Sequence, residues 1–153
     1  MSPATRFGIV TLLVSLWVHA SEVFRYFVIV MPTMRDELSE VVGVAPMNGR
    51  VMAVWAVWDT LLTAFVVGIT RLFVGPWGHR WPTVVAAGSF AWLGFFLLFW
   101  IGMVNMGLSS VGLASVALPL AWIEMVVAAG LASWLWRRLR DASRAAPKEQ
   151  PHA

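Results

Sequence analysis

Four long apolar runs alternate with short polar segments along the chain. Each run reaches the roughly 20 residues that a helix needs to cross the hydrocarbon core of a bilayer. None alternates with a period of two, as the strands of a membrane β-barrel do. Gly88 and Gly94 in the third run predict close contact with a neighbouring helix. The pattern therefore predicts an all-α, integral membrane four-helix bundle within residues 1–140, with spans at about 7–30, 51–70, 83–105 and 111–136.

The polar segments predict two further features. The segment 31–50 is the only long connection, and Pro32 and Asp36 in it resemble the start of a capped helix. We expect a short interfacial helix there, ending at Gly43 in the first outer loop. Residues 141–153 are polar and contain proline, which predicts a disordered basic tail.

Composition supports a membrane protein. Hydrophobic residues make up 59% of the 153-residue chain and charged residues only 12%, with a mean hydropathy of +0.76. A soluble domain of this size needs more polar surface. The net charge of +3 does not indicate a nucleic-acid partner, because the basic residues lie at the ends of the apolar runs. We expect the partner to be the lipid bilayer.

The basic residues also predict the orientation. Eight arginine and lysine residues fall on one side of the predicted bundle and two on the other. The positive-inside rule then places both termini in the cytoplasm, with the protein in the cell (inner) membrane. The eight are Arg6, Arg71, Arg80, Arg137, Arg138, Arg140, Arg144 and Lys148, and the two are Arg35 and Arg50.

Five ionisable residues lie inside the predicted spans, where each costs on the order of 2.5–3.5 kcal/mol. His19, Glu22 and Arg25 belong to the first span, Asp59 to the second and Glu124 to the fourth. A rise of about 1.5 Å per residue brings them to similar depths. Glu22 and Arg25, three residues apart, can pair. Asp59 and Glu124 have no obvious basic partner, and burial favours a neutral carboxyl that can donate a proton.

Each of these features also has a structural interpretation. The Glu22–Arg25 pair can simply fix helix packing. His19 is more often a hydrogen-bonded packing residue than a metal or heme ligand, and no metal site is predicted because no Glu-x-x-His pair occurs. Deep tryptophans are more often packing residues, yet five at one level would suit a flat, apolar ligand. These are Trp17, Trp55, Trp58, Trp92 and Trp122.

Short stretches along the whole chain match a known family. They are Leu16-Trp17, Pro46-Met47-Asn48-Gly49, Gly94-Phe95-Phe96-Leu97, Ala117-Leu118-Pro119 and the basic tail. In these the chain resembles the styrene oxide isomerases, trimeric four-helix membrane enzymes that use ferric heme b to rearrange an epoxide to a carbonyl compound. The resemblance implies that Asn48 contacts the epoxide oxygen. Val42 and Phe96 stand where the family has its heme-ligating histidine and catalytic tyrosine, so heme is disfavoured and the cofactor stays undecided.

Together these features predict a membrane-embedded acid/base isomerase or cyclase that acts on a small lipophilic substrate, an epoxide or an alkene. Asp59 or Glu124 would donate the proton, and Glu22, oriented by Arg25, would act as the base or counter-charge. The five tryptophans would stabilise developing positive charge by cation–π attraction. The groups that would relay the proton or bind the substrate are His19, Tyr26 and Asn48.

Two other classes of function remain open. The chain could be a small proton-coupled transporter of lipophilic compounds, which would need an oligomer with a water path to both faces. It could also be an accessory subunit whose polar stripe meets a partner helix. The sequence does not name the substrate or decide whether the chain forms a homo-oligomer.

Overall fold

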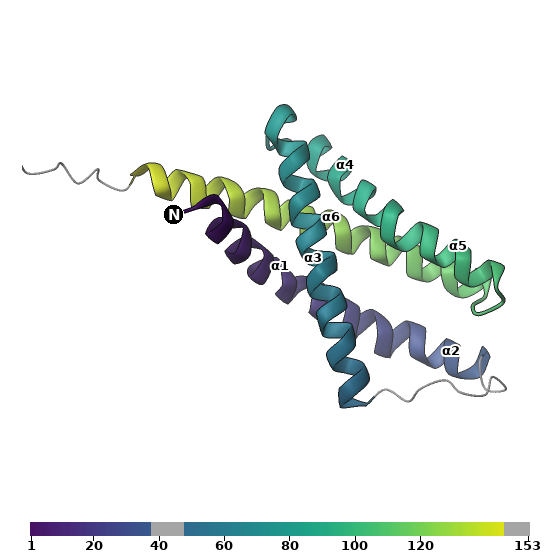
Figure 1. Cartoon of the computed structure of the whole chain (residues 1–153). Helices are drawn as coiled ribbons and strands as arrows, with labels where there is room; N and C mark the ends of the chain where they lie inside the picture. Colours follow the sequence, from purple (N-terminus) through teal and green to yellow (C-terminus); the bar gives the residue numbers. More distant parts are fainter. Residues whose placement is uncertain (38–47, 146–153) are drawn as a thin grey trace, which may run out of the picture.

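The computed structural model describes residues 1–37 and 48–145, which fold into four long helical segments (Figure 1). Each segment is long and apolar enough to cross a membrane. The described residues thus confirm an all-α, four-helix membrane bundle. In chain order the elements are α1 (Pro3–Arg25), the π-helical segment η1 (Tyr26–Val30), α2 (Met31–Glu37), α3 (Gly49–Trp77), α4 (Trp81–Trp92), the π-helical segment η2 (Leu93–Leu97), α5 (Leu98–Asn105) and α6 (Val111–Ala145).

The helices extend beyond their apolar runs because capping and breaking residues determine where a helix ends. α1 begins behind Ser2, whose hydroxyl accepts a hydrogen bond from the Thr5 amide at 3.1 Å. α3 ends at Gly78, which has a φ of 76° that glycine adopts without steric cost. Hydrophobicity therefore predicts that a span is present, whereas these local signals determine its length.

The first connection differs from the expected one. The helix predicted to start near Pro32 is present as α2, but it continues directly from α1 through η1, and one helical segment runs from Pro3 to Arg35. No cap separates it from the span, because Met31 keeps helical backbone angles and its amide bonds to the Tyr26 carbonyl. The predicted end of this helix at Gly43 lies outside the described residues.

The start of the predicted tail is helical. α6 runs to Ala145, five residues into the segment 141–153 that we expected to be disordered. Its last turns are held by contacts to the rest of the bundle, such as the 3.3 Å hydrogen bond from Arg6 to the Ser143 hydroxyl. Residues 146–153 lie outside the described part.

α6 contacts α1, α3 and α4, and in Figure 1 it runs alongside α4 and α5. Small residues make this packing close. A Cβ atom added to Gly88 of α4 would lie 2.6 Å from the Val126 Cα atom of α6, so the two backbones touch there. The expectation for Gly94 was wrong, because an added Cβ atom would meet nothing within 4 Å. The residues of α6 that are fully buried include Ala117, Ala121, Ala128, Ala129 and Ala132.

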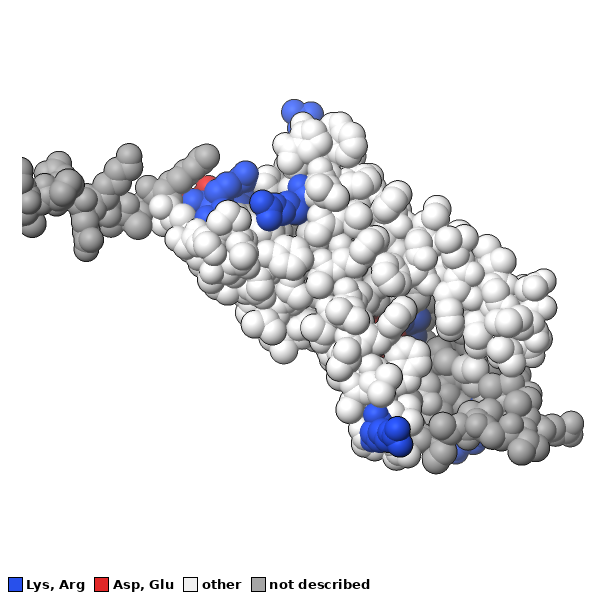
Figure 2. All heavy atoms as spheres, viewed as in Figure 1, with Lys and Arg blue, Asp and Glu red and all other residues white. Residues whose placement is uncertain are grey.

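The arginines expected on one side of the bundle do gather at one end. The Arg71 guanidinium lies 5.1 Å from the Trp136 ring centroid, and Arg140 hydrogen-bonds to His79 at 2.7 Å. These contacts bring together the end of α3, the α3–α4 connection and the end of α6. Figure 2 shows the basic side chains concentrated at this end, and few on the apolar flank of the bundle. We refer to it as the basic end.

Trp92 provides a first testable contact. Its indole N–H donates to the Leu118 carbonyl at 2.9 Å, tying α4 to α6 directly before Pro119. We expect Trp92→Phe to lower the free energy of unfolding by about 1 kcal/mol, the usual net value of one hydrogen bond. Unfolding in mixed micelles with increasing SDS would measure it. Trp55→Phe is the matched control at an exposed ring and should change stability by less than about 0.5 kcal/mol, so equal losses would contradict the role of the hydrogen bond.

Candidate functional site

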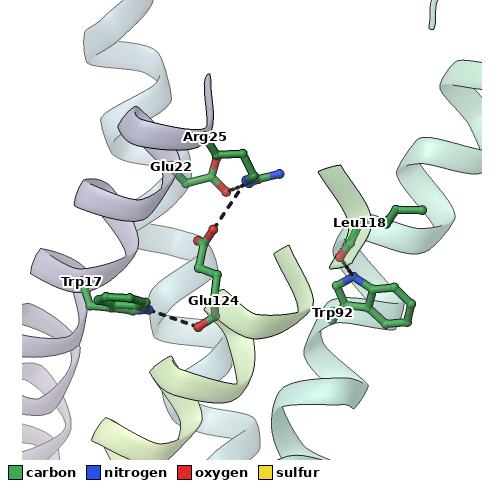
Figure 3. Close-up of polar contacts among 6 residues, drawn as sticks. All are labelled: Trp17, Glu22, Arg25, Trp92, Leu118 and Glu124. Carbon is green, nitrogen blue, oxygen red and sulfur yellow. Dashed lines mark hydrogen bonds and ion pairs between the residues drawn. The ribbon is translucent and has the colours of Figure 1, made fainter. Parts of the chain in front are cut away.

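Arg25 lies between two glutamates that come from different helices (Figure 3). Its guanidinium forms an ion pair and hydrogen bond with Glu22 of α1, and its Nε atom lies 3.6 Å from Oε2 of Glu124 on α6. The Arg25 side chain is 7% exposed, that of Glu124 is 0% exposed and that of Glu22 is 20% exposed. Charged groups this deep in an apolar bundle are retained only when they are paired.

Two π-helical segments lie on either side of this arginine. η1 begins at Tyr26, directly after Arg25, and the Tyr26 amide bonds to both the Glu22 and Val23 carbonyls. η2 carries Phe96, whose ring centroid lies 4.9 Å from the Arg25 guanidinium carbon. The ring supplies a cation–π contact on one face of the guanidinium. π-helical turns are rare and occur frequently at functional sites, and here both lie at the level of the charged cluster.

Asp59 of α3 belongs to the same cluster. It is buried and close enough to interact electrostatically with Glu22, His19 and Arg25. Glu124 interacts in turn with Glu22 and Asp59. The carboxyl groups of α1, α3 and α6 are therefore close enough to influence one another electrostatically. We call Glu22, Arg25, Asp59 and Glu124 the carboxylate cluster.

The carboxylate cluster has unused hydrogen-bonding capacity. Neither carboxyl oxygen of Glu124 makes a hydrogen bond within the described residues, and neither does the Nε atom of Arg25. The Ser21 hydroxyl interacts with Glu124 without hydrogen-bond geometry. Most buried polar atoms in proteins are hydrogen-bonded, and the exceptions are often functional groups. The cluster can therefore accept a polar group of a ligand without first breaking a good hydrogen bond at Glu124.

His19 does not fit the axial ligand of a heme. Its Nδ1 atom lies 2.7 Å from the Ser15 carbonyl and its Nε2 atom 3.3 Å from the Ala56 carbonyl. Both ring nitrogens thus face backbone oxygens, whereas an iron ligand needs a free nitrogen lone pair. Within residues 1–37 and 48–145, no three or more His, Cys, Asp or Glu side chains are placed to share a metal.

Four of the five tryptophans proposed to bind the ligand do not lie in the interior of the bundle. Trp17, Trp55, Trp58 and Trp122 are 36–49% exposed and lie on the outside of the bundle. Similar depth does not imply a shared direction, because each residue turns the helix by about 100°. Trp92 and Trp122 line another site, an apolar groove of about 510 Å³ beside Pro119 of α6.

Trp17 still contacts the candidate site through its indole N–H group. The Trp17 N–H donates to the backbone carbonyl of Glu124 at 3.2 Å (Figure 3). This bond joins α1 to α6 one turn below the Glu22–Arg25 pair and fixes the backbone that carries the Glu124 carboxyl. Trp17 is therefore a positioning residue in this structure.

The two remaining candidates differ in position. Tyr26 is half-buried next to Arg25, and its ring makes an edge contact with Phe27 at a centroid distance of 5.1 Å. Asn48 is exposed and caps α3, where its side-chain oxygen accepts the Arg50 and Val51 amides at 3.1 Å each. The structure therefore does not bring Asn48 to the carboxylate cluster, because asparagine here satisfies the free amides of a helix start.

Glu22 is the partly exposed member of the carboxylate cluster. Figure 2 shows a hollow between α3 and α5 with basic and acidic atoms at its base, in an otherwise uncharged surface. The partial exposure of Glu22 agrees with an opening at this level.

Comparison with known proteins assigns no family to this fold and site. No family model matches the chain, and neither a curated protein nor a solved structure matches it.

Proposed function

We propose that this protein is a membrane-embedded acid/base isomerase or cyclase that acts on a small lipophilic substrate, such as an epoxide or an alkene. The observation that supports it is that the Glu22 carboxyl of α1 and the Glu124 carboxyl of α6 pair with one guanidinium, while the buried Asp59 carboxyl of α3 lies within electrostatic range, beside a lateral hollow. We also infer that the basic end, where both described termini lie, faces the cytoplasm of the cell (inner) membrane. α2 and the start of α3 are then at the outer face.

The cluster contains the groups that epoxide isomerisation needs. Two carboxyl groups pair with one guanidinium and a third, that of Asp59, is buried nearby, so the arrangement with least buried charge keeps Glu22 ionised against Arg25 and keeps Glu124 and Asp59 protonated. Glu124 or Asp59 then donates its proton to the epoxide oxygen as a carbon–oxygen bond breaks. Positive charge that develops on carbon is stabilised by the Glu22 carboxylate.

The second half-reaction restores the enzyme. Glu22 removes a proton from the carbon next to the cationic centre, and the product is an isomer of the substrate. The proton on Glu22 returns to the acid residue, so no atom is gained or lost. Exclusion of bulk water by the apolar bundle keeps the intermediate from being hydrolysed.

Turnover by matched amide variants tests this proposal. The purified protein in lipid nanodiscs would be incubated with styrene oxide or limonene oxide, and the products followed by gas chromatography. We expect the wild type to isomerise at least one epoxide, and Glu124→Gln and Asp59→Asn each to lose about 100-fold in rate, the scale of general acid–base catalysis. Asp141→Asn, an exposed acid outside the cluster, should keep full activity. Full activity in both cluster variants, or no product from either epoxide, would contradict the proposal.

A second candidate function is a small proton-coupled transporter. It is favoured by the excess of carboxyl groups over guanidinium groups in the cluster, which implies bound protons midway through the bundle. Proton flux driven by a lipophilic cation across proteoliposomes separates the two functions. Flux that Glu124→Gln abolishes would support transport, whereas the isomerase shows none.

A further inference from the structure

A second polar cavity lies at the basic end, outside the carboxylate cluster. It has a volume of about 220 Å³ and is formed by the α3–α4 connection, the start of α4 and the last part of α6. Its polar lining consists of His79, Ser133 and Arg137, and its aromatic lining of Trp81 and Trp134. No spacing rule indicates this cavity from the sequence, because Ser133 and Arg137 are far from His79 along the chain.

The hydrogen bonds of His79 hold an arginine beside this cavity. The Nε2 atom lies 2.7 Å from an Nη atom of Arg140, and Nδ1 lies 2.8 Å from the Ser133 hydroxyl. Arginine can only donate, so Nε2 accepts and the ring proton is on Nδ1, from which it donates to Ser133. The neutral imidazole thus positions Arg140, while Arg137 lines the cavity from the same helix.

The backbone adds to the positive potential. α4 begins at Trp81, at the edge of the cavity, and its N-cap residue Arg80 makes no side-chain capping bond. Pro82 has no N–H group, so the Trp81 and Thr83 amides of the first turn, together with the helix dipole, favour an anion at this point. A negatively charged ligand is therefore favoured by the two arginines, the histidine and the helix start around this cavity.

We propose that this cavity binds the phosphate headgroup of an anionic phospholipid. The position favours a lipid over a soluble phosphate, because the cavity lies where an apolar bundle meets the basic end. Trp81 and Trp134 are large, exposed aromatic side chains at that boundary, and such residues prefer the headgroup region. Basic pockets between membrane helices are suited to anionic headgroups, and the acyl chains can lie along the exposed apolar faces of the bundle.

His79 makes the binding depend on pH. Burial, followed by the charges of Arg140 and Arg137, lowers the pKa of His79, while the Ser133 hydrogen bond and the Asp141 carboxylate raise it. A bound phosphate favours the imidazolium, so its pKa is higher in the complex. Protonated His79 also releases the Arg140 donors to the phosphate. Affinity should therefore increase as the pH falls.

Titration calorimetry on the full chain in detergent tests the site. The probe is dihexanoyl phosphatidylglycerol, with dihexanoyl phosphatidylcholine and inorganic phosphate as separate arms. We expect binding of phosphatidylglycerol alone, with an affinity about tenfold weaker in Arg137→Gln, because a charge-assisted hydrogen bond is lost. The affinity of the wild type should rise roughly threefold or more from pH 7.5 to 5.5, and that of His79→Gln should stay flat.

The control is Arg71→Gln, which removes the same charge at the basic end without touching the cavity lining, because Arg71 stacks on Trp136. It should weaken binding less than about threefold. An equal loss in both variants, or none in Arg137→Gln, would show mere surface attraction and overturn the proposal. Equal binding of phosphatidylcholine would overturn it as well. Equal binding of inorganic phosphate would replace the lipid with a soluble anion.

Discussion

Replacing Arg25 with methionine should lower the free energy of unfolding by about 3–5 kcal/mol, the cost of removing one partner from a buried ion pair. The Arg25 guanidinium pairs with both Glu22 and Glu124. Without it, the Glu22 carboxylate either stays charged in an apolar interior or takes up a proton, and the Glu124 carboxyl loses its partner. Both outcomes cost stability, and the Phe96 ring also loses its cation–π partner. Unfolding in SDS mixed micelles at neutral pH would measure the loss.

A triple variant distinguishes charge from shape. The variant combines Arg25→Met with Glu22→Gln and Glu124→Gln. It removes the charges of both ion pairs, and each new side chain has a volume similar to that of the one it replaces. Replacing a complete buried ion pair with neutral groups is often neutral or stabilising, so the triple variant should recover most of the lost stability. Arg71→Met, an exposed arginine stacked on Trp136, should cost less than about 1 kcal/mol. A triple variant as unstable as Arg25→Met would mean that packing, and not unpaired charge, explains the loss.

The predictable part of the site follows from the high cost of charge in a membrane. Glu22, Asp59 and Glu124 could be expected to face the interior because none of them can face lipid cheaply. A rise of about 1.5 Å per residue then places them at similar depth. The two constraints together predict the carboxylate cluster from the sequence.

The unpredicted part depends on rotation about the helix axes and on contacts between distant residues. The Arg25–Glu124 ion pair joins residues 99 positions apart, so no spacing rule indicates it. The outward direction of Trp55 and Trp58 follows from how α3 is turned against its neighbours. Asn48 was assigned to the substrate by resemblance, whereas the capping of α3 determines its role here.

The close contact of α4 and α6 leads to the second large prediction. Gly88→Leu should lower the free energy of unfolding by roughly 3 kcal/mol or more, the upper range for overpacking in a tight core. The atoms that a Cβ would meet are backbone atoms of Val126 and Met125, at 2.6 to 2.9 Å, and these cannot rotate away. The two helices must separate by about 1 Å to restore ordinary contact distances. Since Met125 and Val126 directly follow Glu124, this separation would also shift the carboxylate cluster.

Gly94 supplies the matched control for this prediction. It lies six residues further along the same helical segment, and an added Cβ atom there would meet nothing within 4 Å. Gly94→Leu should change the free energy of unfolding by less than about 1 kcal/mol. The two alanine variants should change the free energy of unfolding in opposite directions. Gly94→Ala should raise it by up to about 1 kcal/mol through higher helix propensity, whereas Gly88→Ala should lower it by about 1–3 kcal/mol through the clash. Equal effects at both positions would contradict a backbone contact between α4 and α6 at Gly88. Together, the variants at the two glycines test whether this contact holds α6, and with it Glu124, against the rest of the site.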